Sequence, residues 1–128
     1  MVQRVALVTG GMGGIGEAIS TRLADNGYKV AVTYSPGSGK AQQWQQDMRA
    51  RGYSFFGVEC DVTSLDSCTK MIGKVQSELG PVDILVNNAG ITRDATFKKM
   101  TQVDWDAVIT TNLTSLFNVT KPVMDGML

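Results

Sequence analysis

Two short runs of the chain carry residue types that bind phosphates and hold polar ligands. The run VTGGMGGIG, Val8 to Gly16, has five glycines in the seven positions from Gly10, and the run NNAG occupies Asn87 to Gly90. Glycines after a strand let backbone N–H groups approach a phosphate, and the N-terminus of a following helix adds roughly half a positive charge. Five clustered glycines cost conformational entropy that a plain turn does not require, so we interpret the first run as a phosphate site.

The spacing of these glycines fits three motifs, and the run alone does not choose among them. The motifs are G-x-G-x-x-G on Gly11, Gly13 and Gly16, T-G-x-x-x-G-x-G on Thr9, Gly10, Gly14 and Gly16, and T-G-x-x-G-x-x-G on Gly10, Gly13 and Gly16. A Walker A phosphate loop is excluded, because the chain contains no Gly-Lys-Ser or Gly-Lys-Thr.

Composition excludes several other classes of site. The chain has no histidine, which removes serine-histidine-aspartate catalysis and the H-E-x-x-H zinc site. Cys60 and Cys68, eight residues apart, form no metal-ligand pattern and are expected to be reduced, buried thiols, with no metal site. Twelve basic and twelve acidic residues cancel, and no basic run or long apolar run points to nucleic acid or a membrane.

The elements that must position the two runs alternate between strands and helices. Short apolar runs predict strands at residues 4–9, 28–34, 54–59 and 82–87, the last of them buried. Apolar residues at helical spacing predict helices at 14–26, at 40–51, from Thr63 or Ser64 to 79, and from 101 onward. The fold class is therefore α/β, a Rossmann-like doubly wound parallel sheet of about four strands with flanking helices, within one domain covering residues 1–128.

Two local features refine this prediction. Thr101 and Asp104 have the spacing of a capping box, which opens the last helix, whereas Pro122 should kink or end that helix and bend it near Asn118. NNAG follows the fourth strand directly, so it should lie at the carboxyl edge of the sheet beside the glycine turn, where open α/β sheets bind ligands. There the two asparagine amides can brace neighbouring strands and position a ribose.

Three motifs in register resemble the short-chain dehydrogenase/reductase family: Thr9 to Gly16 read as T-G-x-x-x-G-x-G, Asp61-Val62 after the third strand, and NNAG. The runs VTGGMGGIG, NNAGITRD, WDAVITTNLTSLFNVTK and DGM are similar to the bacterial members that reduce acetoacetyl-CoA with NADPH in polyhydroxybutyrate synthesis. The 3-oxoacyl carrier-protein reductases of fatty acid synthesis share much of this pattern and remain the alternative.

The resemblance assigns roles only to positions that match. The glycine run would face the cofactor pyrophosphate, Asp61 and Val62 the adenine, and the NNAG run the riboses. The implied cofactor-binding residues are Thr9, Gly10, Gly14, Ile15, Gly16, Asp61, Val62, Asn88, Ala89 and Gly90. Asn112 matches the family's catalytic asparagine, which bends its helix locally and holds a water behind the active-site lysine.

Cofactor choice depends on the end of the second strand. An NAD enzyme normally presents Asp or Glu there to the ribose 2′-hydroxyl, but Thr33-Tyr34-Ser35 contains no acid. A 2′-phosphate is therefore not repelled, so NADP(H) is the expected cofactor, with Ser35, Ser38 and Lys40 available to contact that phosphate. Lys40 can also be an ordinary solvated lysine at a helix start.

The family's acid–base residues do not occur in these 128 residues. A tyrosine followed four residues later by lysine protonates the substrate in the family, but the residues four beyond Tyr28, Tyr34 and Tyr53 are Val32, Ser38 and Gly57. The catalytic serine has no counterpart either. We therefore expect an amino-terminal part of a family member, inactive by itself and prone to self-association because residues 82–87 form a sheet edge.

Partners and location follow from the resemblance. The full-length parent is expected to reduce an acyl-CoA thioester as a cytoplasmic homotetramer. The remaining alternative from another class is a non-catalytic module that binds a dinucleotide or pairs with homologous subunits. Arg93 and Asp94 either border the substrate entrance or form a solvated pair.

Overall fold

A computed structural model describes residues 3–91 and 93–128. Met1, Val2 and Thr92 lie outside the described residues. Thr92 is one position of the NNAGITRD run. The strands are β1 (Val5–Val8), β2 (Lys29–Tyr34), β3 (Phe56–Glu59) and β4 (Ile84–Val86). The helices are α1 (Gly14–Asp25), α2 (Ala41–Ala50), α3 (Leu65–Leu79), α4 (Gln102–Ile109) and α5 (Ser115–Met127), with a π-helical turn at Thr110–Thr114 between the last two.

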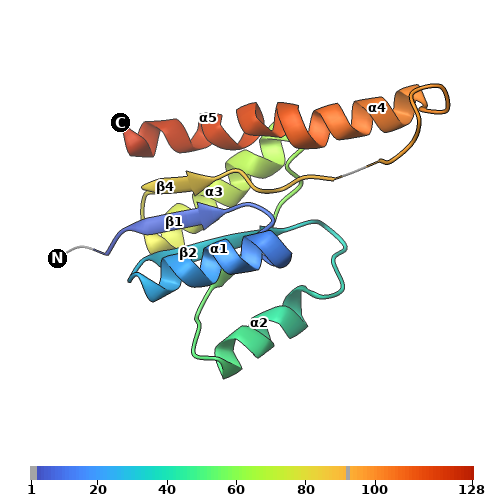
Figure 1. The fold of residues 1–128 in the computed structure, drawn as a ribbon. Helices are drawn as coiled ribbons and strands as arrows, with labels where there is room; N and C mark the ends of the chain where they lie inside the picture. Colours follow the sequence, from blue (N-terminus) through green and yellow to red (C-terminus); the bar gives the residue numbers. More distant parts are fainter. Residues whose placement is uncertain (1–2, 92) are drawn as a thin grey trace.

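The four strands form one parallel sheet in the order β3-β2-β1-β4 (Figure 1). This order confirms the predicted doubly wound α/β fold. All four residues of β1 are buried, because β1 lies between β2 and β4 and is covered on both faces. The carboxyl ends of β1 and β4 are therefore neighbours, which brings the glycine turn and NNAG to one edge of the sheet.

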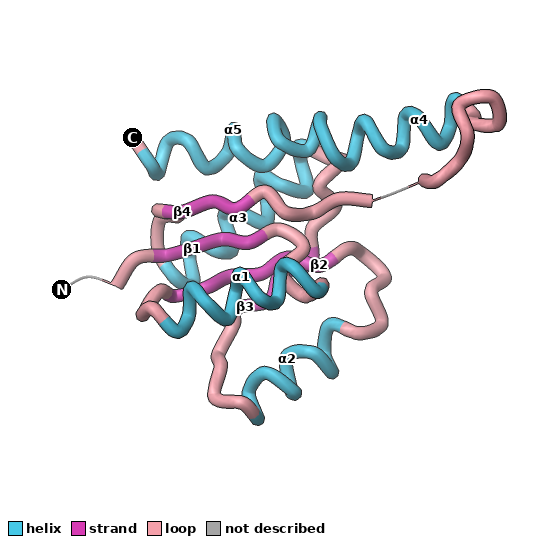
Figure 2. Tube along the Cα trace, viewed as in Figure 1, coloured by secondary structure: helices cyan, strands magenta, loops and turns pink. Residues whose placement is uncertain are grey.

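Helices lie on both sides of the sheet (Figure 2), and alternate residues of the strands contribute to two hydrophobic cores, one on each face. Val5 and Leu7 pack with α3 and α5, whereas Ala6 and Val8 pack with α1 and α2. This alternation is the period-two pattern of a strand buried on both sides. The fold thus has three layers, with the sheet between two layers of helices. The glycine turn joins the end of β1 to the start of α1.

Helix starts are set by hydroxyl caps where the sequence predicts them. The Ser64 hydroxyl accepts a hydrogen bond from the Ser67 N–H at 3.1 Å, which begins α3. Likewise, the Thr101 hydroxyl accepts from the Asp104 N–H at 3.1 Å and begins α4. Such caps satisfy N–H groups that the helix itself leaves unpaired, worth about 1 kcal/mol each.

The last part of the chain departs from two predictions. The fourth strand is not fully buried: Ile84, Leu85 and Val86 are each half-buried, because β4 is the edge of the sheet, and this edge position is the one predicted for residues 82–87. Pro122 also does not end its helix, since α5 runs through it to Met127. The irregular turn lies earlier, at Thr110–Thr114, where it joins α4 to α5.

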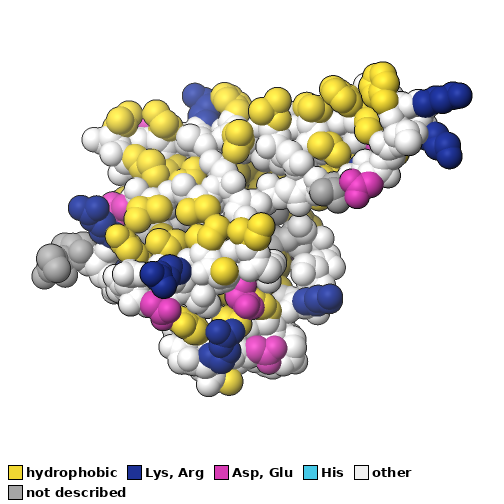
Figure 3. Space-filling model, in the orientation of Figure 1, with side chains coloured by type: hydrophobic (Ala, Val, Ile, Leu, Met, Phe, Trp, Pro, Cys, Tyr) yellow, Lys and Arg dark blue, Asp and Glu magenta, His cyan; other side chains and the backbone are white. Residues whose placement is uncertain are grey.

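Apolar side chains remain exposed along α4 and α5, and Figure 3 shows hydrophobic groups along these helices. Leu113 is 59% exposed and Phe117 57%, although both fit the apolar periodicity of the sequence. Among the described residues, no helix is both long and apolar enough to cross a membrane.

Candidate functional site

The glycines after β1 differ in whether the fold requires them. Gly10 has φ +62°, a conformation that favours glycine, and a Cβ on Gly16 would collide with the Gly10 carbonyl and lie 2.8 Å from Asn88 Nδ2. By contrast, a Cβ on Gly14 would meet nothing within 4 Å, and one on Gly13 only the Gly10 oxygen at 3.8 Å. The fold itself therefore demands Gly10 and Gly16, while Gly13 and Gly14 leave an open surface at the start of α1.

That open surface coincides with an uncapped helix N-terminus. Gly13 is the N-cap residue of α1, and no side chain caps the helix there. The first hydrogen bond of the helix runs from the Glu17 N–H to the Gly13 carbonyl. Within the described residues, the N–H groups of Gly14, Ile15 and Gly16 have no acceptor. Free N–H groups at a positive helix end, without side chains over them, fit the phosphates of a dinucleotide.

Thr9 locks this turn to NNAG. Its hydroxyl oxygen accepts hydrogen bonds from the N–H groups of Asn88 and Ala89, both at 3.0 Å, and the hydroxyl lies 3.4 Å from the Val86 carbonyl. The Asn88 amide in turn donates to the Gly10 carbonyl at 3.1 Å. Two loops separated by almost eighty residues of chain are therefore held as one unit, in agreement with the predicted bracing by an asparagine amide.

Thr33 also binds this unit, although its sequence position was not predicted to provide a partner for the glycine turn. The hydroxyl of Thr33, near the end of β2, accepts from the Gly10 N–H at 3.1 Å and is 2% exposed. A hydroxyl residue inside an otherwise apolar buried strand is the signal that points to such a role, since a buried hydroxyl requires a partner. Thr33 thus links the second strand to the glycine turn.

A cleft of about 610 Å³ opens beside this unit and is walled by the ends of β2 and β3 and by the start of the π turn. Ser35, Asp61 and Val62 line it, together with Ile91 and Thr110. One carboxylate oxygen of Asp61 accepts from both the N–H and the hydroxyl of Thr63, which fixes the acid at the rim. The predicted adenine-side residues are therefore brought together.

Lys40 is not among the residues that line this cleft. It is the exposed N-cap residue of α2, at the end of the loop that follows Ser35. The structure therefore brings Ser35 to the cleft, while contact of Lys40 or Ser38 with a cofactor phosphate stays a prediction.

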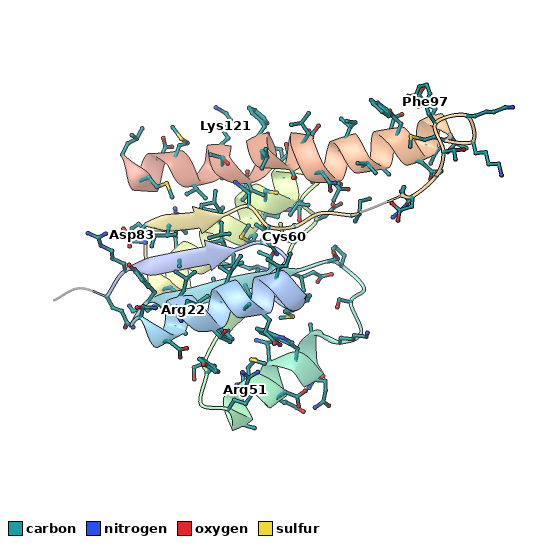
Figure 4. The ribbon with its side chains drawn as sticks, viewed as in Figure 1. Arg22, Arg51, Cys60, Asp83, Phe97 and Lys121 are labelled. Atoms are coloured by element: carbon teal, nitrogen blue, oxygen red, sulfur yellow. The ribbon has the colours of Figure 1, made fainter. Side chains whose placement is uncertain are left out.

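Cys60, labelled in Figure 4, also lines the cleft, and its sulfur lies 3.8 Å from that of Cys68. Both thiols are buried, as the sequence predicts. A hydrogen bond from Cys68 lowers the pKa of Cys60, helped by the Ser67 hydroxyl, although burial opposes this shift. The same pairing and burial raise the pKa of Cys68. The pairing therefore makes Cys60, which lines the cleft, the more acidic of the two thiols.

Asn112 lies at the centre of the π-helical turn and binds the backbone just after NNAG. Its Oδ1 accepts from the Ile91 N–H at 2.8 Å, and its Nδ2 donates to the Ile91 carbonyl at 2.8 Å. A Cβ on Gly90 would lie 3.1 Å from Asn112 Oδ1, so the close approach requires a small residue there. The helix is thus locally widened where the resemblance implies a bend, and Ile91 is a partner that the sequence did not reveal.

Arg93 and Asp94 belong to a second hollow, of about 300 Å³, that also includes Ile91 and Asn112. Both residues are exposed, so whether they border a substrate entrance or form a solvated pair stays a prediction. Among residues 3–91 and 93–128, no three acidic or cysteine side chains gather closely enough to hold a metal ion.

Comparison with protein families gives one match over nearly the whole chain. The family model described as short chain dehydrogenase matches residues 4–128. An acetoacetyl-CoA reductase from Cupriavidus necator is 56% identical over 127 residues, which is 99% of this chain and 52% of that protein. A 3-oxoacyl-(acyl-carrier-protein) reductase from Staphylococcus epidermidis is 42% identical over 127 residues, again 99% of this chain and 52% of that protein.

Solved structures agree with the fold. An actinorhodin polyketide ketoreductase crystallised with NADPH superposes with a TM-score of 0.90 at 36% identity, covering 98% of this chain and 48% of that one. The chain spans about half the length of the curated relatives that it matches.

Proposed function

The chain belongs to the short-chain dehydrogenase family, and from this membership we propose that the protein carrying it reduces a 3-oxoacyl thioester, acetoacetyl-CoA, with NADPH. The observation that carries the proposal is the open, uncapped N-terminus of α1 beside the Thr9–Asn88 lock. Free N–H groups, a ribose-sized polar edge and an adjoining cleft are what a dinucleotide requires. A bound nicotinamide would supply the hydride.

The residues of this chain would hold and orient that cofactor. The N–H groups of Gly14, Ile15 and Gly16 would bind the pyrophosphate, and the cleft with Asp61 and Val62 would take the adenine. Further cofactor-binding roles are proposed for Thr9, Gly10, Ser35, Lys40, Asn88, Ala89 and Gly90. NADPH is preferred over NADH in this proposal, because no acid at the end of β2 repels a 2′-phosphate.

Asn112 is proposed as the catalytic-site residue of this chain. Both of its bonds to Ile91 use the side-chain amide, so the amide fixes the segment after NNAG against the widened turn. The backbone carbonyls that a π turn frees are the groups available to hold a relay water there. The tyrosine-lysine pair and the serine of the family do not occur in residues 1–128, so we propose that these residues alone perform no turnover.

The acetoacetyl-CoA substrate is supported by the 56% identity to the Cupriavidus necator reductase. A 3-oxoacyl carrier-protein thioester is the second candidate, supported by the 42% identity to the Staphylococcus epidermidis reductase. We also propose a homotetramer, because exposed apolar side chains along α4 and α5 are suited to an interface between copies. The free thiols of Cys60 and Cys68 support a reducing, cytoplasmic location.

The test is consumption of NADPH, followed by its absorbance, with the full-length protein that carries residues 1–128. Acetoacetyl-CoA, acetoacetyl carrier protein and NADH are compared in matched assays. We expect the highest kcat/KM for acetoacetyl-CoA with NADPH, and no turnover by residues 1–128 alone. A higher kcat/KM for the carrier-protein thioester would establish the second candidate instead. Binding of NADPH without reduction of either thioester by the full-length protein would favour a non-catalytic module.

A further inference from the structure

Cys60 and Cys68 are two thiols that take no part in the chemistry of the proposed function. Their sulfurs lie 3.8 Å apart, and both side chains belong to the hydrophobic core between the sheet and α3. A disulfide bond holds two sulfurs at about 2.05 Å. A short movement therefore separates this pair of thiols from a covalent bond.

The two thiols differ in their access to solvent. Cys60 is 3% exposed and lines the cleft of about 610 Å³, whereas Cys68 is 0% exposed and is not among the lining residues. Met71 and Val75 share the buried face of α3 with Cys68 and are also 0% exposed, so this face is held in the core. A reagent that enters the cleft meets Cys60 first, and it must be small to reach so little exposed sulfur.

Cys60 is also the more acidic thiol. The contact with Cys68 lowers the pKa of Cys60, and the Ser67 hydroxyl, 4.0 Å from the Cys60 sulfur, acts in the same direction, whereas burial and the Asp61 carboxylate oppose the shift. The contact between the thiols raises the pKa of Cys68, and burial adds to this. Since the thiolate is the form that attacks an oxidant, oxidation should begin at Cys60.

The backbone of Asp61 is held by the same part of α3. Its N–H donates to the Ser67 hydroxyl at 2.9 Å, and its carbonyl oxygen lies 3.8 Å from the Cys68 sulfur. Asp61 and Val62 line the cleft and directly follow Cys60. Cys60 lies just beyond the end of β3, whereas Cys68 lies within α3, so a bond between them draws the strand end toward the packed helix. This wall of the cleft should therefore change shape when the bond forms.

We propose that Cys60 and Cys68 form a reversible disulfide when a small hydroperoxide attacks Cys60 through the cleft, and that this disulfide displaces the adenine side of the cleft. The second part rests on the proposed function, because it takes the cleft to hold the adenine of the cofactor. Asp61 and Val62 move with the strand end, and the oxidised protein binds NADPH more weakly than the reduced protein.

The oxidation balances in two steps, written for hydrogen peroxide. The Cys60 thiolate attacks one peroxide oxygen, so an S–O bond forms, the O–O bond breaks, and the leaving hydroxide takes the proton that Cys60 lost and becomes water. The Cys68 sulfur then attacks the sulfur of the Cys60 sulfenic acid: the S–S bond forms, the S–O bond breaks, and the hydroxide leaves as water with the Cys68 proton. The two thiols give two electrons to the peroxide, and a dithiol reductant returns them by thiol–disulfide exchange.

Peptide mass shows whether the disulfide forms. The full-length protein is treated with hydrogen peroxide, unfolded, alkylated and digested with trypsin, which releases residues 52–70 with both cysteines in one peptide. We expect a peptide that carries no alkyl group and is two hydrogens lighter than the dithiol form. A dithiol reductant added before alkylation should restore alkylation of both cysteines. A peptide that stays doubly alkylated after peroxide treatment, or that only gains oxygen, would overturn the proposal.

Single variants test which thiol reacts first. In Cys68→Ala the partner is missing, so peroxide should add oxygen to Cys60. In Cys60→Ala the remaining thiol does not line the cleft, so Cys68 should stay open to alkylation after the same treatment. Equal oxidation of the remaining thiol in the two variants would contradict entry through the cleft and overturn the proposal.

Binding of NADPH measures displacement of the cleft wall. The Kd of the oxidised protein should be roughly tenfold higher than that of the reduced protein, and saturating NADPH should lower the equilibrium constant for disulfide formation by the same factor. A dithiol should restore the low Kd, whereas it does not reverse methionine sulfoxide, which separates the disulfide from other oxidation. Cys68→Ala forms no disulfide and should keep its affinity under the same treatment. Equal Kd values for the two forms of the unchanged protein would overturn the displacement.

Failure of the proposed function has a separate signature. In that case NADPH binds neither the oxidised nor the reduced protein, and amide hydrogen exchange reports on the strand end. The Asp61 N–H, which is bonded to Ser67, should exchange faster in the disulfide form. The amides of α1, on the other face of the sheet, should exchange equally in both forms. An unchanged exchange rate at Asp61 would overturn the displacement whether or not NADPH binds.

Discussion

The edge of the sheet around Thr9 and the outer face of α4 and α5 are built in opposite ways. Thr9 is 1% exposed and its hydroxyl serves two N–H groups of the NNAG loop, so polar atoms there are paired within the chain. On α4, none of the eight residues is buried, and Phe117 on α5 is 57% exposed. The difference teaches that the fold holds the edge of the sheet around Thr9 by its own contacts, whereas the exposed face of α4 and α5 contributes little to folding and is available for other contacts.

The sharpest test of the pinned edge is a pair of glycine substitutions within one helix turn. Gly16→Ala places a Cβ against the Gly10 carbonyl and 2.8 Å from Gly11 Cα, so we expect a loss of about 3 kcal/mol in unfolding free energy. Gly14→Ala meets no atom of the protein and should raise stability by about 0.5 kcal/mol. Denaturant unfolding measures both.

The same pair separates folding from binding. Gly14→Ala should weaken NADPH binding by roughly tenfold in a titration, because the methyl group occupies the surface on which we place the pyrophosphate. If Gly14→Ala left NADPH binding unchanged, the open surface at the start of α1 would not be the phosphate site.

Removing the Thr9 hydroxyl should loosen the lock between the two loops. Thr9→Val keeps the shape but leaves the N–H groups of Asn88 and Ala89 without their acceptor, which should cost about 2 kcal/mol. Thr9→Ser keeps the hydroxyl and should cost only the buried methyl, about 1 kcal/mol. Urea unfolding of the three proteins measures both losses, and no loss of stability in the Val variant would mean that the hydroxyl contributes only volume.

Substitution of Asn112 tests whether its hydrogen bonds to Ile91 fix the segment after NNAG to the turn between α4 and α5. Asn112→Ala removes both bonds to Ile91 and should cost about 1 kcal/mol, because the site is partly open to solvent. Exchange of the Ile91 amide hydrogen should accelerate in this variant. Thr114→Ala, an exposed position of the same π turn, is the control and should leave that exchange rate unchanged.

On the outer face we expect a much smaller effect. Phe117→Ser should change the unfolding free energy of the subunit by no more than about 0.5 kcal/mol, because the ring is mostly in solvent. Sedimentation should nevertheless show a smaller assembly if this face joins copies of the chain. Val119→Ala, two residues along the same helix but 1% exposed, is the matched change and should cost about 2 kcal/mol. Equal losses of unfolding free energy in the two variants would mean that the exposed and buried faces of α5 contribute equally to stability.

The smallest effect concerns a surface contact of α1 at high pH. The Tyr53 hydroxyl donates to Asp25 at 2.9 Å, and this hydrogen bond raises the pKa of Tyr53 above its ordinary value of 10.0. The folded protein therefore favours the protonated phenol, and this contribution is complete below about pH 10 and lost as pH rises through the folded pKa. The Tm difference between the unchanged protein and Tyr53→Phe should be constant at lower pH and shrink in alkaline solution. A constant difference throughout would contradict the bond.

Local signals made much of the fold predictable. Ser64 and Thr101 cap helices where their sequence context predicts it, because a cap is decided within four residues. The position of β4 at the edge of the sheet was predicted correctly, but full burial of this strand was not, since an apolar strand has the same sequence pattern in the middle of a sheet as at its edge. Pro122 was predicted to kink or end its helix, and the second of these outcomes is wrong, because packing of α5 against α3 outweighs one missing hydrogen bond.

The sequence predicted which residues lie at the candidate site, but not the hydrogen bonds that hold them together. Thr9, Asn88 and Gly10 were identified as neighbours of a ligand, and bracing by the asparagine amides was expected, but the hydrogen bond from the Asn88 N–H to the Thr9 hydroxyl across almost eighty residues was not predicted. Thr33 and Ile91 were missed as partners for the same reason: each uses a backbone or hydroxyl group whose partner is fixed only by the tertiary structure. The roles of these residues toward a cofactor stay predictions.

The side chain of Asn112 does for Ile91 what a neighbouring strand would do. Its carboxamide presents one acceptor and one donor side by side, which is the pattern of a main-chain amide, and it holds Ile91 five residues beyond the end of β4. Aspartate lacks the donor, and leucine lacks both groups. Asparagine is therefore required at position 112 because its side chain pairs with the Ile91 backbone as another backbone amide would. A rotation of the helix at this turn would move Ile91 through these two hydrogen bonds.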